Sequence, residues 1–360
     1  MSALYLFLAA VVVAGIVTAI ATPFVIRLAT YLGVIDAIGD ERRVHENPTP
    51  RIGGLALFFG FAFALFVVLG IALAYPHLLF PSLSTGASSL HDLRAEIATL
   101  SDQLGASKSV VGLLFGSMLI LAVGAWDDLM GGMRPRNKLF AQIVVALISM
   151  LYGFIIPGTT NPFDHNPYTN WINFPLWLGI PLTLFWYVAM MNAINFIDGL
   201  DGLLSGVTAI SCLSIFVISF QQGQPAVALI VAALAGAALG FLPYNFNPAK
   251  IFLGDAGSLF IGYVFATISI IGTAKSAITI SLLVPVVILA LPILDTFFAI
   301  VRRMLSGKRI TEADRGHFHH QLIFRFGLNV RQAVLLIYVV CLLLGTVALA
   351  FSGAIPGVRL

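Results

Sequence analysis

The chain has 360 residues, of which 59% are hydrophobic and only 10% are charged. Soluble domains carry about 25% charged and about 45–50% apolar residues, so this composition excludes an ordinary soluble globular protein. The formal net charge is only +3, and we expect no nucleic-acid partner.

Continuous apolar runs divide the chain into candidate membrane spans. Runs of about 20 apolar residues are long enough to cross a bilayer as helices, and the lack of alternation argues against a barrel. The runs cover 3–29, 54–75, 109–125, 139–156, 173–192, 203–221, 225–243, 257–273, 278–301 and 332–353. We therefore predict an all-α polytopic membrane protein of about ten transmembrane helices, forming one integral membrane domain over residues 1–360.

The charges predict which side the loops occupy. Ten spans place both termini on one face and collect five loops on the other, around 30–53, 126–138, 193–202, 244–256 and 302–331. Of the nineteen Lys and Arg residues, all but Arg94, Lys108, Lys275 and Arg359 fall on this second face or at its border. Because cytoplasmic loops carry an excess of Lys and Arg, we expect a multi-pass protein of the cell membrane with these loops in the cytoplasm. Asp, Asn and His interleave with the basic residues, which indicates a site for an anionic, metal-dependent ligand.

The long loop on the opposite face, about 76–108, contains an amphipathic pattern. Its apolar residues recur at three- and four-residue spacing, which is typical of a helix with one apolar face. They are Leu90, Leu93, Ile97, Leu100 and Leu104. The pattern predicts a helix lying on the membrane surface, with a homodimer contact as the alternative.

Two adjacent acids, Asp127 and Asp128, stand where the third span meets the cytoplasm, in "AWDDLMGGMRPRNK". Carboxylates at a membrane boundary are costly unless they are solvated, paired or bound to metal. Basic residues follow within a dozen positions, ending with Lys138. The pair predicts a functional site, and a solvated helix end with local ion pairs is the alternative.

The stretch "MNAINFIDGLDGL" carries four polar residues at the end of an apolar span. Asn192, Asn195 and Asp198 are three residues apart and so follow one side of a helix, and Asp201 continues the series. Helix capping accounts for one such residue but not for four. We therefore predict a polar site here.

The stretch "NFNPAKIFLGDAGSLF" predicts a helix beginning near Gly254. The unpaired N–H groups of a helix N-terminus suit a phosphate. Asp255 either caps this helix or, beside a phosphate, holds Mg²⁺. Phe252 is placed to stack on a nucleobase or to join the core. Arg51, in "PTPRIGG", is near enough to the bilayer surface to reach a phosphate.

The largest cytoplasmic loop contains "DRGHFHHQLI", with His317, His319 and His320 next to Arg315. These histidines suit a transition metal in principle, but their spacing is poor for zinc and the other loops offer no Cys. Phosphate binding by the histidines and Arg315 is the favoured interpretation.

In order, spacing and sidedness, these motifs resemble those of the polyprenyl-phosphate N-acetylhexosamine-1-phosphate transferases, over nearly the whole chain. The resemblance implies ten transmembrane helices, Mg²⁺ (or Mn²⁺ in its place), a UDP-sugar and a long-chain prenyl phosphate. It also implies transfer of sugar-1-phosphate to the lipid with release of UMP. Two branches compete. "PRIGG" and "HFHH" resemble the branch that uses UDP-GlcNAc and undecaprenyl phosphate, and the alternative is the phospho-MurNAc-pentapeptide transferase branch.

Residue by residue, the resemblance implies three kinds of role. The catalytic candidates are Asp127, Asp128 and Asp198. The metal candidates are Asp255 and Asp198. The substrate-binding candidates are Arg51, Lys138, Asn192, Asn195, Asp201, Phe252, Arg315, His317, His319 and His320.

A membrane transporter is the remaining alternative. Transporters gather their polar groups near the bilayer midplane, often within inverted repeats. Here the acids cluster at one interface, which favours an enzyme.

Overall fold

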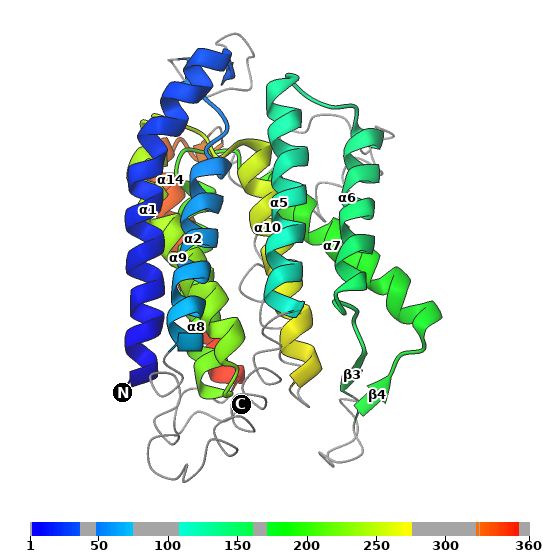
Figure 1. Cartoon of the computed structure of the whole chain (residues 1–360). Helices are drawn as coiled ribbons and strands as arrows, with labels where there is room; N and C mark the ends of the chain where they lie inside the picture. Colours follow the sequence, from blue (N-terminus) through cyan, green and yellow to red (C-terminus); the bar gives the residue numbers. More distant parts are fainter. Residues whose placement is uncertain are drawn as a thin grey trace.

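The structure is a computed structural model of the chain, and it describes residues 2–36, 48–74, 108–160, 171–275, 322–323 and 325–352. The described part is a helical bundle with two short antiparallel strand pairs (Figure 1). The helices are α1 (Ser2–Leu32), α2 (Gly54–Ala74), α5 (Lys108–Leu129), α6 (Pro135–Leu151), α7 (Leu176–Ile197), α8 (Leu203–Gln221), α9 (Pro225–Asn245), α10 (Gly254–Lys275) and α14 (Val330–Phe351). The strands are β1 (Ile35–Asp36), β2 (Thr49–Pro50), β3 (Gly158–Thr160) and β4 (Trp171–Asn173).

The prediction of an all-α polytopic membrane protein is confirmed. Seven of the described helices are long and apolar enough to cross a membrane, and α2 adds a shorter apolar stretch, Gly54–Val68. Nine of the ten predicted spans coincide with described helices. The tenth, 278–301, and the amphipathic segment of the 76–108 loop lie outside the described residues, so the count of ten stays a prediction.

Several helix ends differ from the predicted ones. α6 begins at Pro135, four residues before the apolar run, because proline suits the first turn of a helix. α7 continues to Ile197, beyond the apolar run that ends at residue 192. α10 begins at Gly254, as the motif around Asp255 predicts, although its apolar run starts only at residue 257. Apolarity alone therefore makes these helices too short. The extra turns are polar, and they carry Lys138, Asn195 and Asp255 into regular helix.

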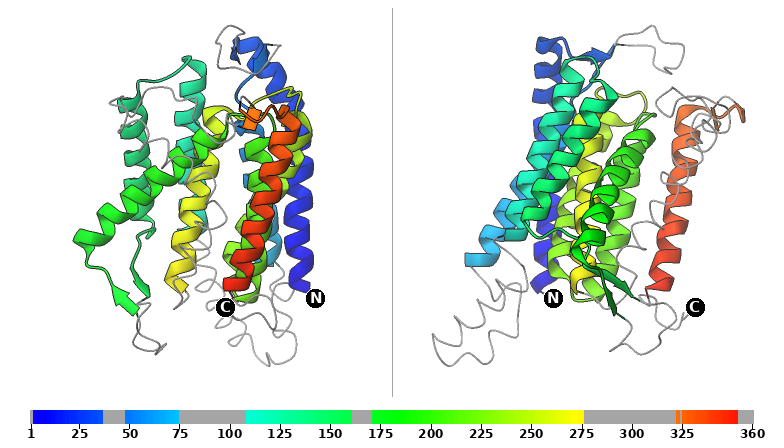
Figure 2. Two further views of the ribbon diagram at one scale, coloured as in Figure 1. Left: turned by 180° about the vertical axis from the view of Figure 1, so that it is seen from behind. Right: turned by 90° about the vertical axis from the view of Figure 1, so that its right-hand side faces the viewer.

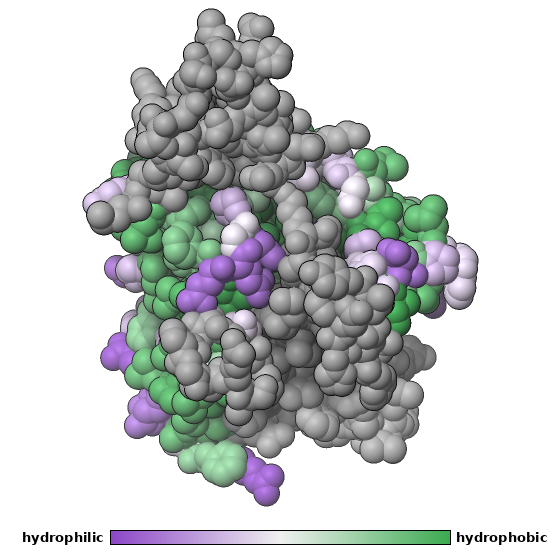
Figure 3. All heavy atoms as spheres, turned by 90° about the horizontal axis from the view of Figure 1, so that it is seen from below, coloured by the Kyte–Doolittle hydropathy of each residue, from purple (hydrophilic) through white to green (hydrophobic). Residues whose placement is uncertain are grey.

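The outer face of α1 shows how the bundle meets lipid. Its exposed apolar side chains recur every four residues, and each is more than half exposed. They are Leu8, Val12, Ile16, Ile20 and Phe24. Seen from the end of the bundle opposite the acids, apolar residues occupy much of the described outer rim, with polar residues among them (Figure 3). The opposite face of α1 packs on α9 through small residues, because a Cβ on Gly236 would lie 2.2 Å from the carbonyl oxygen of Val11.

α10 is the most enclosed of the described candidate membrane spans. Of the residues in its apolar stretch 83% are buried in the protein, compared with 28% for α1. It lies among α2, α5 and α7 (Figures 1 and 2). It approaches α7 closely at Gly262, where a Cβ would lie 2.7 Å from Met191 Cα. α10 therefore has little freedom to move relative to its neighbours.

All six acidic residues that the structure describes lie at one end of the bundle, the upper end in Figure 1, at helix ends or in the adjoining loops. They are Asp36, Asp127, Asp128, Asp198, Asp201 and Asp255. In the middle of the bundle, hydroxyl groups pair with one another instead, as Ser149 Oγ does with Tyr263 Oη at 2.8 Å. This distribution is unlike that expected of a transporter.

Candidate active site

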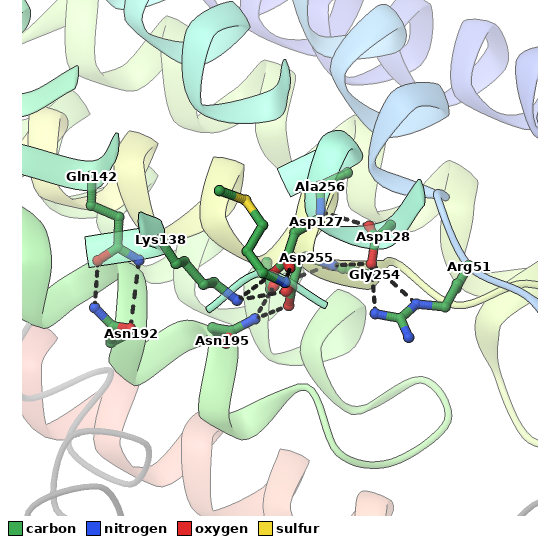
Figure 4. Close-up of polar contacts among 12 residues, drawn as sticks. Arg51, Asp127, Asp128, Lys138, Gln142, Asn192, Asn195, Gly254, Asp255 and Ala256 are labelled. Carbon is green, nitrogen blue, oxygen red and sulfur yellow. Dashed lines mark hydrogen bonds and ion pairs between the residues drawn. The ribbon is translucent and has the colours of Figure 1, made fainter. Parts of the chain in front are cut away.

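The acids gather where the C-terminal ends of α5 and α7 meet the N-terminal ends of α6 and α10 (Figure 4). Asp127 and Asp128 are only 2% and 3% exposed. They are therefore not a solvated helix end. Buried carboxylates need hydrogen bonds or ion pairs, and each has its own set.

Asp128 caps α10 from a neighbouring helix. Its Oδ1 accepts a hydrogen bond from the backbone N–H of Asp255 at 3.1 Å, and its Oδ2 accepts one from the N–H of Ala256 at 3.0 Å. These two N–H groups would otherwise lack an intrahelical partner. The interpretation of Asp255 as the cap of its own helix is therefore wrong, and two of the N–H groups expected to face a phosphate are already occupied.

Arg51 completes the surroundings of Asp128. Its guanidinium donates from Nε and Nη2 to Asp128 Oδ1, at 3.1 and 2.9 Å, and its Nη1 lies 3.6 Å from Asp36 Oδ1. Charge-assisted hydrogen bonds of this kind are the stronger ones in proteins. In this structure Arg51 is thus engaged with a carboxylate rather than free for a phosphate.

The glycines of "PRIGG" explain how Arg51 reaches this position. The segment before α2 pairs with the segment before α10, with Phe252 N–H donating to Pro50 O at 2.8 Å and Gly53 N–H donating to Phe252 O at 2.9 Å. A Cβ on Gly54 would lie 2.1 Å from the backbone N of Gly257. Only a glycine allows this approach. Phe252 is partly buried within the paired segment.

Lys138 joins the other two carboxylates. Its Nζ lies 3.0 Å from Asp127 Oδ2 and 2.5 Å from Asp255 Oδ2. Asp127 also accepts a hydrogen bond from the backbone N–H of Met133. The ammonium group thus links the acid at the end of α5 to the acid at the start of α10 (Figure 4).

Asn195 holds the remaining oxygen of Asp255. Its Nδ2 donates to Asp255 Oδ1 at 2.6 Å and to Ser258 Oγ at 2.7 Å. Each oxygen of Asp255 is therefore positioned by a different helix, one by α6 and the other by α7.

Asp198 directly follows the last residue of α7 and is the C-cap of that helix. Burial, followed by the negative charges of Asp255 and Asp128, raises the pKa of its carboxyl to about 8. Among the described residues, none donates a hydrogen bond to this carboxyl. The raised pKa favours the protonated form of this carboxyl near neutral pH, and a bound cation would favour the carboxylate.

Two predicted site residues are engaged elsewhere. Asp201 Oδ2 accepts hydrogen bonds from Asn247 Nδ2 and Ala249 N, both at 3.0 Å, and so holds the loop before α10. Asn192 pairs with the side chain of Gln142. Arg315, His317, His319 and His320 lie outside the described residues, and their roles stay predictions.

The sequence analysis missed Gln142 and Met133. Gln142 is a lone amide within an apolar span, but it follows Lys138 by four residues and so lies on the same side of α6. That spacing is the signal that identifies it. Met133 acts through its backbone N–H, which no residue type reveals.

The donors suit a hard cation. Within the described residues, no three His, Cys, Asp or Glu side chains converge as a ready metal site. Mg²⁺, however, usually takes only one or two carboxylates and completes its shell with water and phosphate oxygens. Asp255 and the nearby Asp198 would supply such carboxylates.

The close approach of α5 to α10 at this site gives a steric prediction. A Cβ on Gly124 would lie 2.4 Å from the carbonyl oxygen of Asp255. We expect Gly124→Ala to push the start of α10 away from Asp127 and Lys138 and to lower activity by about tenfold or more, since misplacement of reacting groups by about 1 Å can cost about 100-fold. The matched control is Gly70→Ala, whose Cβ meets nothing within 4 Å. Equal activity of the two purified variants would contradict the argument.

Buried carboxylates, with a half-buried lysine and arginine, at one end of an apolar bundle define the class of protein. It is a polytopic membrane protein with a charged site at the membrane boundary, of a kind that suits an anionic substrate.

Comparison with known proteins identifies the family. Residues 110–273 match the model of glycosyl transferase family 4. The chain is 33% identical to the probable undecaprenyl-phosphate N-acetylglucosaminyl 1-phosphate transferase of Bacillus subtilis, over 96% of this chain and 85% of that protein. It is 34% identical to the decaprenyl-phosphate N-acetylglucosaminephosphotransferase of Mycolicibacterium smegmatis, over 90% of this chain and 77% of that protein. It is 32% identical to the phospho-N-acetylmuramoyl-pentapeptide-transferase of Staphylococcus saprophyticus, over 68% of this chain and 76% of that protein.

The chain belongs to glycosyl transferase family 4, in the group of polyprenyl-phosphate N-acetylhexosamine-1-phosphate transferases. It is a multi-pass membrane enzyme that transfers a phospho-sugar, and enzymes of this kind are generally metal-dependent. The resemblance inferred from the motifs is confirmed.

Proposed function

We propose that this enzyme transfers GlcNAc-1-phosphate from UDP-GlcNAc to undecaprenyl phosphate or a similar polyprenyl phosphate. The products are UMP and polyprenyl-diphosphate-GlcNAc, and the reaction is the first membrane step in the synthesis of a cell-wall or surface polysaccharide. The observation that carries the proposal is the pairing of Lys138 with Asp127 and Asp255 at the membrane boundary. There a water-soluble donor and a lipid-bound acceptor can meet.

The acceptor needs little activation. The second pKa of a phosphate monoester is near 6, so the prenyl phosphate is mostly a dianion at pH 7. Its oxygen attacks the β-phosphorus of the donor, the bond from that phosphorus to the bridging oxygen breaks, and UMP leaves with the electron pair. A general base is not required, and we favour this direct transfer over a phospho-aspartate intermediate.

The main barrier is the approach of two anions. Lys138 is placed to exchange a carboxylate for a phosphate oxygen and so to offset the charge that develops in the transition state. Asp127 holds Lys138, while Asp128 and Arg51 hold the start of α10. Asp255 and Asp198 would hold Mg²⁺, or Mn²⁺ in its place, which supplies neutralisation of the phosphate charge when bound.

The remaining candidates extend the site toward the rest of the donor. Phe252 is proposed to lie beside the uracil, and Asp201 acts near the nucleotide through the loop that it holds. His317, His319, His320 and Arg315 are proposed to contact the pyrophosphate or the sugar. The five basic loops, and with them the site, are proposed to face the cytoplasm.

The donor sugar is tested by supplying the purified protein, Mg²⁺ and undecaprenyl phosphate with either UDP-GlcNAc or UDP-MurNAc-pentapeptide and following UMP. "PRIGG" and the similarity to N-acetylglucosaminyl-phosphate transferases over at least 90% of this chain favour UDP-GlcNAc. We expect UMP release with UDP-GlcNAc and at most a trace with the pentapeptide donor. Release with the pentapeptide donor alone would assign the enzyme to the phospho-MurNAc-pentapeptide transferases.

A further inference from the structure

Gln142 of α6 and Asn192 of α7 form a reciprocal pair of amides. Asn192 Nδ2 donates to Gln142 Oε1 at 2.8 Å, and Gln142 Nε2 donates to Asn192 Oδ1 at 3.5 Å (Figure 4). Asn192 Nδ2 donates in addition to the carbonyl oxygen of Val188 at 2.8 Å. The polar atoms of Asn192 are thus engaged within the protein, although its place in the sequence suggests substrate binding.

The pair is directional, and Gln142 is buried while Asn192 is half-buried. Gln142 is 1% exposed, so removing its partner would leave a buried polar group without a hydrogen bond, which is unfavourable. Apolar side chains at a helix contact tolerate sliding, whereas a buried amide pair has one register. A single buried Asn fixes the register of helices in coiled coils by the same principle.

The position of the pair connects it to the acids. Gln142 lies one turn from Lys138 on α6, and Asn192 lies one turn from Asn195 on α7. Lys138 Nζ and Asn195 Nδ2 contact the two carboxylate oxygens of Asp255, at 2.5 and 2.6 Å respectively. The register between α6 and α7 therefore decides whether both contacts form at once.

The other end of the two helices has its own attachment. There the backbone N–H of Ile156 donates to Thr183 Oγ1 at 2.9 Å, and β3 pairs with β4. Among the described helices, α6 lies at the edge of the bundle, where it packs on α5 and α7 (Figure 1). The amide pair is the polar contact between α6 and α7 that lies nearest to the acids.

We infer that Gln142 is a positioning residue, whose pairing with Asn192 fixes the register of α6 on α7 and so aligns Lys138 and Asn195 on Asp255. The inference rests on the proposed function only in taking this carboxylate as the centre of the transfer. It assigns Asn192 to the same positioning pair.

The test compares Gln142→Leu with the exchanged pair Gln142→Asn/Asn192→Gln, which restores two facing amides of the same total length. Ser149→Ala is the matched control, because Ser149 lies two turns along α6 and bonds Tyr263 rather than the acids. Since misplacement by about 1 Å can cost about 100-fold, we expect Gln142→Leu to lower kcat about 100-fold. KM for UDP-GlcNAc should change by less than about threefold, as for loss of a transition-state interaction. The exchanged pair should recover most of kcat, and Ser149→Ala should keep it.

A second readout needs no substrate. Spin labels at Phe140 of α6 and Phe185 of α7, both well exposed, report the distance between the helices by pulsed electron paramagnetic resonance. We expect the distance distribution to shift or broaden in Gln142→Leu, and to stay as in the parent protein in Ser149→Ala and the exchanged pair. An unchanged distribution in Gln142→Leu would overturn the inference. A shifted distribution in a protein that shows no transfer from UDP-GlcNAc would leave the register claim standing and refute the proposed donor instead.

Discussion

Replacing Asp255 with asparagine is expected to abolish transfer while leaving the protein folded. Asp255 is the point at which α6, α7 and α10 converge, and in the proposed site it is the main metal ligand. The stabilisation of phosphate charge by a bound metal is worth several kcal/mol. We therefore expect kcat to fall by about 1,000-fold or more, since each 1.36 kcal/mol is a factor of ten.

The fold should survive this change for reasons visible in the contacts. Lys138 keeps its pairing with Asp127 at 3.0 Å, so no buried ammonium group loses all its partners. An asparagine oxygen can still accept from Asn195 Nδ2. The melting temperature in detergent should therefore stay within a few degrees of wild type. Transfer at more than about a tenth of the wild-type rate would show that Asp255 is not the centre of the site.

The second large effect is expected for Asp128→Ala, and here stability should fall with activity. The substitution removes four hydrogen bonds, two from Arg51 and two from the first backbone N–H groups of α10. Breaking one side of a buried ion pair costs about 3–5 kcal/mol. We expect a much smaller folded yield and a lower melting temperature.

Asp128→Asn separates capping from charge. An asparagine oxygen can still accept from a backbone N–H of α10, but the ion pair with Arg51 is lost. We expect an intermediate melting temperature and reduced activity, measured per folded molecule after size-exclusion chromatography. Asp128→Ala with wild-type stability would contradict the description of Asp128 as the cap of α10.

Much of this site was predictable because polar residues in an apolar chain stand out. The motifs at Asp127, Asn195 and Asp255 could be placed at one membrane face by counting spans and positive charges. The structure agrees, because the ends of α5, α7 and α10 lie together.

The sequence did not predict the contacts between side chains of different helices. Arg51 and Asp128 are 77 residues apart in the chain, and no local pattern pairs them. The same is true of Gln142 and Asn192, which lie 50 residues apart. From the local sequence, Asp255 could either cap its own helix or bind a metal ion. Only the contact of Asp128 with the first N–H groups of α10 excludes the role of cap. The end of α7 was misplaced for a simpler reason, since the apolar run stops at residue 192 whereas the helix continues through polar residues to Ile197.

Direct transfer of a phospho-sugar to a lipid phosphate at this cluster of acids is tested by incubating the purified protein and Mg²⁺ with UDP-GlcNAc, with and without undecaprenyl phosphate. UMP, lipid-linked GlcNAc and the mass of the protein are followed together. We predict that UMP appears only with the lipid, in equal amount to undecaprenyl-diphosphate-GlcNAc, and that the protein mass does not change. UMP release without the lipid, together with a GlcNAc-1-phosphoryl group attached to Asp127 or Asp128, would contradict direct transfer.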